Sequence, residues 1–491
     1  MATTEVFTYC IIGFVAYVSF LLWCGWHWKE EAGTSPREFF ISGRRFPSWL
    51  TFAVTLATIF SAVTVIGLPA LYANYGVAYL CALWGGALSY VLGTFWLCPK
   101  LRRIAAKHDI ISAPDMFAVR YGTATRILTA LIIIFNSILY IGVTTVGVSL
   151  LFKVFLNIPF SQACVIFAII TAIYLPLGGF AAASWSDAVE GIIMFSCLAL
   201  TVVGSVYFAG GIEASALNLY KTYPQWFAPT GVGGYWNLIN ILAYGLTYLF
   251  GQIGVPVAMR MYWAAKDAGA STRGRAWTAI GSWATFLFPV FAAIALMNLF
   301  PPGTISPDLM VPMFYLKYLG PVACALLFVG ACAAVFSTTE DFSLMVSMSV
   351  MYDIIEKSLK RKLTLQQSIR WYRILTAIVC LLSIPFAIWY PMILLEYAIF
   401  AYGFNAYLGI VLIAGLLWKR ANTLGSCLSL ICGFLVSMYC VFTRPLLFGV
   451  RVHPNAMGIL AAIIALIVGS YLGKPPPHKY LKNYLLTNSQ Y

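Results

Sequence analysis

Four polar residues inside one long apolar stretch have the chemistry of a cation site. Ser337 and Thr338 are adjacent hydroxyls, and Glu340 and Asp341 follow them within the stretch 320–352. Hydroxyl oxygens, together with carbonyl oxygens of a broken helix opposite, suit a hard monovalent cation. The ordinary alternative is that both hydroxyls donate back to carbonyls one turn earlier in their own helix.

Asp341 favours the cation interpretation. On a helix it shares one face with Ser337 and Thr338, whereas Glu340 points about 100° away. A carboxylate within a membrane span costs at least a few kcal/mol and is a functional-site hypothesis by default. Because the stretch continues to Val350, we expect Asp341 in the cytoplasmic half of its span, within reach of water.

Asp187 is a second acid of this kind. It follows Gly178-Gly179-Phe180 at the start of another apolar stretch. The alternative is structural, because an acid in the first turn of a helix complements the helix dipole, and Ser186 could be the N-cap.

Two further stretches are interrupted at corresponding places. Residues 57–69 gather small and hydroxyl side chains before Gly67 and Pro69, and residues 243–256 are rich in glycine and end at Pro256. Paired interruptions in two halves of a chain indicate a transporter site at the membrane midplane. Each interruption opens a group of five stretches, and because five is odd the two halves must be inverted. The alternative is that these glycines and prolines serve packing and kinks alone.

The composition places these residues in a bilayer. Hydrophobic residues make up 61% of the 491 residues and charged residues 9%, and a span needs about 20 mostly apolar residues. We predict thirteen spans near 6–26, 49–71, 77–98, 128–152, 161–177, 184–209, 235–257, 276–300, 320–352, 374–389, 394–418, 422–442 and 456–473.

The basic residues fix the predicted orientation. Of the 30 Lys and Arg, 25 fall in alternate gaps on one side of these spans. The positive-inside rule makes that side cytoplasmic, with the N-terminus outside and the C-terminus inside. The first stretch lacks the basic start and the small-residue cleavage pattern of a signal peptide, so it is a retained span. We therefore predict a multi-pass protein of the plasma (cell inner) membrane.

Other classes of protein are disfavoured. The net charge of +14 follows the cytoplasmic gaps and does not indicate nucleic-acid binding. The twelve Cys lie in or beside apolar stretches without a CxxC pair, and four His remain, so neither disulfides nor a zinc site is predicted. The gaps are too short for a soluble domain. No nucleophile–base arrangement indicates an enzyme, and no organic cofactor is predicted.

These features resemble the sodium:solute symporter family, whose members carry proline, pantothenate, sugars, sialic acid or iodide. The resemblance extends over nearly the whole chain. It rests on the span layout and on five motifs, namely Gly67-Leu68-Pro69, Gly178-Gly179-Phe180, Asp187, residues 244–248 with Gln252, and residues 333–338.

The resemblance implies an all-α fold of the leucine-transporter type, an inverted five-plus-five helix repeat. One extra transmembrane helix precedes the repeat and two follow it, thirteen in total. The corresponding segments are 1–45 for the extra first helix and its loop, 46–209 and 210–418 for the two repeats, and 419–491 for the last two helices and the tail.

The resemblance also implies the binding residues. A sodium ion would lie between the second and ninth spans, held by the carbonyls of Ala57, Phe60 and Ala334 and the hydroxyls of Ser337 and Thr338. The substrate would lie between the broken parts of the second and seventh spans. Its expected lining is Val63, Tyr244, Tyr248 and Gln252.

Three positions depart from the family pattern. Leu175 stands where the family usually has a small or hydroxyl residue before Gly178-Gly179. Val63 stands where proline carriers have a larger aromatic residue, which disfavours a proline substrate. Asp341 stands where some relatives have a serine that helps to hold a second sodium with the acid matching Asp187. Asp187 and Asp341, with Glu340 beside them, could bind a second cation or share a proton.

The sequence thus predicts a sodium-coupled importer of a small organic solute (an amino acid, organic acid, vitamin or sugar) that works by alternating access. Its expected partners are the solute, sodium as the only metal ion, and the lipid bilayer, and we expect it to function as a monomer. One alternative is proton coupling through Asp341 and Asp187. Another is a substrate sensor with a transporter fold, for which a tail of roughly 18 residues is too short to form a signalling domain.

Overall fold

The computed structural model describes residues 4–60, 63–382, 384–388, 394–443, 446–447, 450–478 and 480–481. Within these residues the protein is helical, apart from one short hairpin. The elements are α1 (Thr4–His27), α2 (Lys29–Ala32), α3 (Pro36–Ile41), α4 (Ser48–Ile59), α5 (Leu68–Tyr75), α6 (Tyr79–Ala82), α7 (Trp84–Leu92), α8 (Cys98–His108), α9 (Ala113–Tyr121), α10 (Thr123–Leu156), α11 (Phe160–Phe208), α12 (Ile212–Thr222), α13 (Leu238–Gly254), α14 (Pro256–Ala264), α15 (Ala268–Leu299), α16 (Met310–Phe314), α17 (Pro321–Ser347), α18 (Leu365–Leu382), α19 (Ile384–Ile388), α20 (Leu394–Leu417), α21 (Thr423–Thr443), β1 (Leu446–Leu447), β2 (Val450–Arg451) and α22 (Pro454–Leu472).

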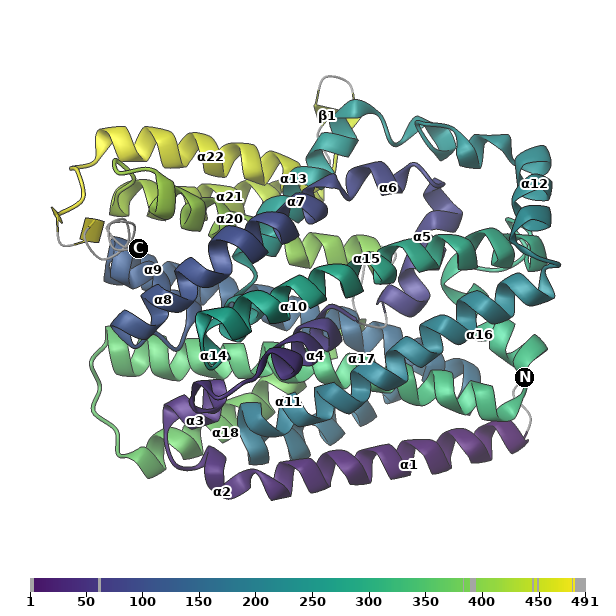
Figure 1. The fold of residues 1–491 in the computed structure, drawn as a ribbon, viewed down its shortest axis with the longest axis horizontal. Helices are drawn as coiled ribbons and strands as arrows, with labels where there is room; N and C mark the ends of the chain where they lie inside the picture. Colours follow the sequence, from purple (N-terminus) through teal and green to yellow (C-terminus); the bar gives the residue numbers. More distant parts are fainter. Residues whose placement is uncertain are drawn as a thin grey trace.

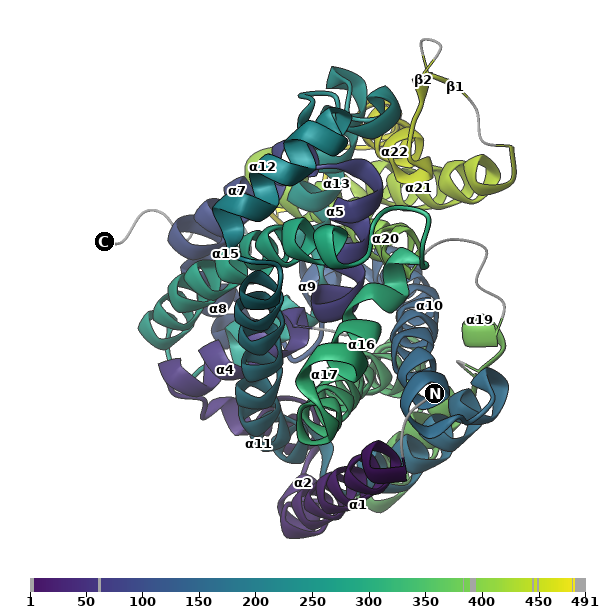
Figure 2. The same ribbon diagram turned by 90° about the vertical axis from the view of Figure 1, so that its right-hand side faces the viewer.

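The long helices form a bundle in which α17 is central. Helix α1 lies along one side and the α21–α22 pair along the opposite side (Figure 1, Figure 2). Helix α17 packs against α1, α4, α10, α11 and α18, and residues 330–349 are buried without interruption. The predicted cation residues of this helix are therefore in the protein interior.

The described helices account for most of the predicted spans. Eleven are long and apolar enough to cross a membrane, and the bent pair of α4 with 64–75 raises the number to as many as twelve. One of the eleven, α11, has 49 residues and covers both stretches predicted at 161–177 and 184–209. Thirteen membrane crossings are reached only if α11 forms two of them. The number of thirteen therefore stays a prediction, and so do the boundaries of the two repeats and the flanking segments.

Both predicted helix interruptions are present. Helix α4 ends at Ile59 with Phe60 in an extended conformation, and its axis makes an angle of 56° with the segment from Thr64 to Tyr75. Helix α13 ends at Gly254, and the extended Val255 separates it from α14. A residue before proline is disfavoured in the helical conformation, which explains the break at Val255 before Pro256.

Four arginines that the sequence analysis counts in cytoplasmic gaps are buried within the protein. Arg102, Arg120, Arg260 and Arg275 are at most 8% exposed. Arg102 donates to the carbonyls of Ala265 at 2.9 Å and Lys266 at 3.0 Å, which replace water as acceptors. Their burial could not be predicted from the sequence, because a basic residue at the end of an apolar stretch resembles a loop residue, and their predicted position on the cytoplasmic side stays a prediction.

Gly179 interrupts α11 between its two predicted spans. Its φ of 57° and ψ of −151° are not helical, and residues with a side chain rarely adopt this region. A Cβ atom here would also lie 2.9 Å from the carbonyl oxygen of Phe39. The backbone change at Gly179 thus requires glycine on two grounds.

We therefore expect Gly179→Ala to lower the free energy of unfolding by about 1–3 kcal/mol. The measurement is thermal unfolding of the purified protein in detergent. Gly191→Ala on the same helix is the matched control, because its Cβ would meet only Ala57 Cβ, at 3.9 Å. Equal melting temperatures for the two variants would contradict the requirement for glycine at position 179.

Candidate functional site

Four carboxylates lie in the interior where α11 and α17 pack together. Asp187 and Glu190 come from α11, Glu340 and Asp341 come from α17, and none is more than 1% exposed. Burying several carboxylates without positive charge is strongly unfavourable. The region, here called the acid cluster (Asp187, Glu190, Glu340 and Asp341), must therefore contain cations, protons or hydrogen-bond donors.

Arg260 supplies one positive charge to the acid cluster. It lies on α14, just after the break at Val255, and its Nη2 forms an ion pair with Asp341 Oδ1, both side chains being fully buried. The guanidinium also lies over the ring of Phe180, 4.0 Å from its centroid. Asp341 is thus an internal ion-pair partner, and the expectation that it is wetted from the cytoplasm was wrong.

Asp341 also contacts the other broken helix. The hydroxyl of Thr58, in the last turn of α4, donates to Asp341 Oδ2 at 2.5 Å. One carboxylate on α17 therefore contacts the segment before the first break and the segment after the second.

Tyrosine hydroxyls neutralise part of the remaining charge. Tyr174 donates to Glu340 Oε1 at 2.5 Å, and Ser186 donates to Glu340 Oε2 at 3.3 Å. Tyr17 of α1 donates to Glu190 Oε1 at 2.5 Å. Glu190 was not identified from the sequence, although its spacing of three residues from Asp187 places both acids on one helix face.

Asp187 is the least satisfied member of the acid cluster. Neither of its carboxylate oxygens makes a hydrogen bond of 3.5 Å or less within the described residues, and the same is true of the Ser337 hydroxyl. Asp187 and Ser337 face each other across α11 and α17 and interact as a longer, weaker hydrogen-bonding pair, and Asp187 interacts in the same way with Glu190. The structure thus brings these two predicted site residues together with unused oxygen atoms.

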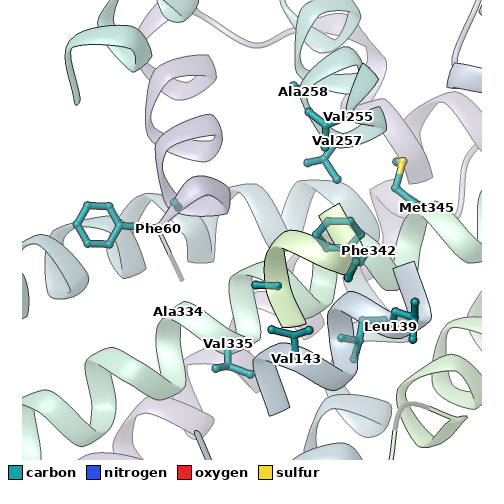
Figure 3. Packing of buried hydrophobic residues seen from close by; sticks show 14 of the residues in the cluster. Phe60, Leu139, Val143, Val255, Val257, Ala258, Ala334, Val335, Phe342 and Met345 are labelled. Carbon is teal, nitrogen blue, oxygen red and sulfur yellow. The ribbon is translucent and has the colours of Figure 1, made fainter. Parts of the chain in front are cut away.

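The other predicted sodium ligands lie on helices that pack against each other. Ala57 is in the final turn of α4 and Phe60 directly follows that helix. Carbonyls at the end of a helix lack helical partners, and α4 packs on α17. Ala57, Phe60, Ala334 and Thr338 are fully buried. Figure 3 shows Phe60 at the end of its segment, with the ring directed away from Ala334.

The two α17 hydroxyls differ. Thr338 Oγ1 donates to the carbonyl of Ala334 at 2.9 Å, as in the ordinary alternative for a hydroxyl within a helix. Ser337 makes no such bond. The Thr338 oxygen keeps a lone pair for a cation, and the Ser337 hydroxyl, which faces Asp187, keeps its oxygen lone pairs for one as well.

A cavity lies beside this region. Its empty volume is about 1020 Å³, part of which is open space, and its lining is largely apolar and aromatic. Tyr248 and Gln252 of α13 line it, together with Thr58. Because Thr58 also donates to Asp341, the cavity and the acid cluster share a residue.

Hydrogen bonds orient the polar groups of the cavity. Gln252 Nε2 donates to the hydroxyl of Tyr90 at 2.9 Å, and the Tyr402 hydroxyl donates to Gln252 Oε1. Tyr248 and Tyr79 share a hydroxyl–hydroxyl bond of 2.5 Å. Tyr90 and Tyr402 belong to helices that the sequence analysis did not associate with substrate.

The two other predicted lining residues are placed differently. Tyr244 is not among the lining residues. It shares a hydroxyl–hydroxyl bond of 2.9 Å with Tyr235, and its ring centroid is 5.3 Å from that of His453. The side chain of Val63 lies outside the described residues.

The described residues contain no group of three or more His, Cys, Asp or Glu side chains arranged to hold a metal ion. All twelve cysteines are free. The oxygen atoms available to an ion are thus those of carbonyls, hydroxyls and single carboxylates, which suit an alkali cation.

Comparisons with known proteins agree on one family. The profile of the sodium:solute symporter family matches residues 39–433. A sodium/pantothenate symporter of Escherichia coli is 27% identical, with 91% of this chain and 93% of the relative covered. An osmoregulated proline transporter of Bacillus subtilis is 24% identical, with 95% of each chain covered.

Solved structures share the fold. A sodium-coupled sialic acid symporter, solved in a substrate-bound outward-open state, superposes with a TM-score of 0.82 at 18% identity, covering 95% of this chain and 98% of that one. A transporter of the nucleobase–cation symport family 1 superposes with a TM-score of 0.57 at 14% identity, covering 92% and 98%.

The buried ion pair between Arg260 and Asp341 leads to a prediction about the stability of variants. Asp341→Asn leaves the Arg260 guanidinium buried without an anion, and we expect it to lower the free energy of unfolding by about 3–5 kcal/mol. Removing both charges, in Arg260→Met with Asp341→Asn, should recover most of that loss.

Chemical unfolding of the purified variants in detergent gives the three free energies of this double-mutant cycle. Arg260→Met alone is the third corner of the cycle. If the two single losses simply add in the double variant, the residues do not interact and the ion pair is absent.

Proposed function

The chain belongs to the sodium:solute symporter family, and from this premise we propose that it couples the inward movement of sodium to the import of a small organic solute. The carrying observation is the Asp187 carboxylate facing the Ser337 hydroxyl, both buried and neither making a hydrogen bond of 3.5 Å or less within the described residues. Unsatisfied buried oxygens are costly, and a bound sodium ion would satisfy both.

The proposed sodium site extends from this pair to the end of α4. The ligands would be the carbonyls of Ala57, Phe60 and Ala334 and the hydroxyls of Ser337 and Thr338. The C-terminal end of α4 carries the negative end of its helix dipole and favours a cation. Asp187 would supply the neutralising charge, and bound sodium would hold α4 against α17.

The proposal also includes a site for a second coupling ion. Arg260 already neutralises Asp341, so the proposed place for a second cation or a proton is on the side of Asp187, Glu190 and Glu340. The four carboxylates of the acid cluster face one arginine, Arg260, which makes a bound proton the alternative coupling ion. We propose sodium as the coupling ion because Ser337 and the end of α4 offer neutral oxygen atoms. Such oxygens are ligands for sodium, whereas a proton would bind to a carboxylate without them.

The solute would bind in the cavity lined by Tyr248 and Gln252. Pantothenate and proline are the solutes in the names of two relatives, and both are small organic acids or amino acids. Because Thr58 lines the cavity and also contacts Asp341, movement of α4 would change both sites at once. Alternating access is the proposed cycle, in a monomer of the plasma membrane with its N-terminus outside.

The test is uptake into proteoliposomes under an inward sodium gradient, with a panel of amino acids, sugars, carboxylates and vitamins that includes proline and pantothenate. We expect Ser337→Ala combined with Thr338→Ala to raise the half-saturating sodium concentration about 10- to 100-fold, as for the loss of hydrogen-bonding groups from a charged ligand. Asp187→Asn should act in the same direction.

Ser343→Ala is the matched control on the same helix, because the Ser343 hydroxyl contacts Cys380 Sγ at 3.5 Å and is not among the proposed sodium ligands. Uptake that persists without sodium, is unchanged by the double alanine variant and follows a pH gradient would overturn sodium coupling. In that case Asp187→Asn and Asp341→Asn should abolish the proton-driven uptake.

A further inference from the structure

Arg275 is a buried cation that has no counter-ion among the residues the structure describes. It lies on α15 and is 2% exposed, and neither its Nε nor its Nη1 has a hydrogen-bond partner within the described residues. Its neighbours are aromatic rings, with the guanidinium 4.3 Å from the centroid of Tyr90 and 5.8 Å from that of Tyr262. A buried guanidinium without an anion is strongly unfavourable.

Other buried arginines of this protein are satisfied differently. Arg102 donates to two backbone carbonyls, and Arg260 has the carboxylate of Asp341. Among the described residues Arg275 makes neither kind of contact, although its burial is as complete. An external anion is therefore the partner that its surroundings lack.

The side chain of Arg275 lines the cavity that also contains Tyr248 and Gln252. Space for it is provided by Gly93, where a Cβ atom would lie 3.2 Å from Arg275 Nε. Gly93 begins a π-helical turn, Gly93–Leu97, and such turns recur at functional sites.

Hydrogen bonds fix the ring beneath the guanidinium. The Tyr90 hydroxyl accepts from Ser282 Oγ at 2.7 Å and from Gln252 Nε2 at 2.9 Å. Tyr90 is thus held in place as a platform, and its position orients the flat face of Arg275. A planar guanidinium with free N–H groups binds a carboxylate through two parallel hydrogen bonds.

The rest of the cavity restricts the solute further. Its described lining contains no Asp or Glu, and most of it is apolar or aromatic. An ammonium group in the solute would find no carboxylate among the described lining residues, only hydroxyl and carbonyl oxygens, whereas hydroxyl, amide and hydrocarbon groups would find partners. This favours an organic acid over an amino acid.

We propose that Arg275 binds the carboxylate of the transported solute, and that the solute is an organic acid without an ammonium group. The proposal rests on the transport function proposed above and concerns the same cavity. Arg275 is the specificity-determining residue, whereas Tyr90 and Gln252 position it.

The test compares acids with their neutral amides. Thermal stabilisation of the detergent-purified protein is measured with pantothenate, lactate, pyruvate and phenylacetate, with the primary amide of each, and with L-proline. Each measurement is made in sodium methanesulfonate and, in parallel, in potassium methanesulfonate, which gives chloride-free solutions with and without sodium. Sodium-driven currents from proteoliposomes are recorded for the same compounds.

We expect at least one acid to stabilise the protein at a concentration about 10- to 100-fold lower than its amide, the ratio expected for charge-assisted hydrogen bonds. Arg275→Gln should abolish this ratio, and Arg275→Lys should retain part of it. Arg273→Gln is the control, because Arg273 lies on the same helix, exposed, with Ser48 Oγ at 3.3 Å. If Arg275→Gln does not fold, the proposal is tested by two other measurements. These are the binding of acid and amide by Arg275→Lys, and the ratio of the acid and amide concentrations that stabilise the wild type.

Several results would overturn the proposal. These are equal stabilisation by acid and amide, stabilisation by L-proline or the amides alone, an effect that chloride reproduces, no response to any of the acids, and wild-type binding of the acid by Arg275→Gln. Failure of the proposed sodium-coupled transport would give a different result from failure of the proposed role of Arg275. An acid that binds through Arg275 but is carried equally well without sodium would overturn sodium coupling and leave the role of Arg275 intact.

Discussion

The contacts of Asp341 hold the two broken helices against the centre of the protein. Arg260 reaches it from α14, just after the break at Val255, and Thr58 reaches it from α4, just before the break at Phe60. Charges in a low-dielectric interior attract strongly, but they are costly to separate. The positions of α4 and α14 relative to α17 are therefore coupled through one carboxylate. Any movement of either segment that breaks these contacts must give Asp341 or Arg260 another partner or water.

The rest of the acid cluster shows how such a partner could be provided. Glu190 and Glu340 each accept a hydrogen bond from a tyrosine hydroxyl at 2.5 Å, whereas Asp187 accepts none of 3.5 Å or less within the described residues. A cation bound near Asp187 and Ser337 would complete the electrostatics that Arg260 begins. Because binding to one conformation stabilises that conformation, sodium would favour the arrangement in which α4 closes on α17. This is the differential interaction that a population shift requires.

The sequence was sufficient for features that depend on local rules. Apolar stretches predicted the helices, and Pro256 predicted the break before it, because the residue before proline avoids the helical conformation. Asp187, Glu340 and Asp341 were identified because acids within apolar stretches are rare. Their partners were not, since Arg260 is 81 residues from Asp341 and only tertiary packing brings them together. Arg260 and Arg275 also resembled loop charges, because each lies near the end of an apolar stretch. Tyr244 shows the limit of motif reasoning, since it lies one helical turn from Tyr248 and yet packs away from the cavity.

The charge of the solute and the charge of the coupling ions together determine how the membrane potential acts on transport. A carboxylate at Arg275 adds a negative charge to a cavity that Thr58 joins to the acid cluster. Moving one negative charge inward opposes an inside-negative membrane potential by about 2.3 kcal/mol per 100 mV. One accompanying sodium ion makes the transported complex neutral, so that only the sodium gradient drives it. A second cation or a proton on the Asp187 side would add a positive charge and let the membrane potential contribute as well. The unsatisfied carboxylate of Asp187 is therefore the group on which the energetics of accumulating an organic anion would depend.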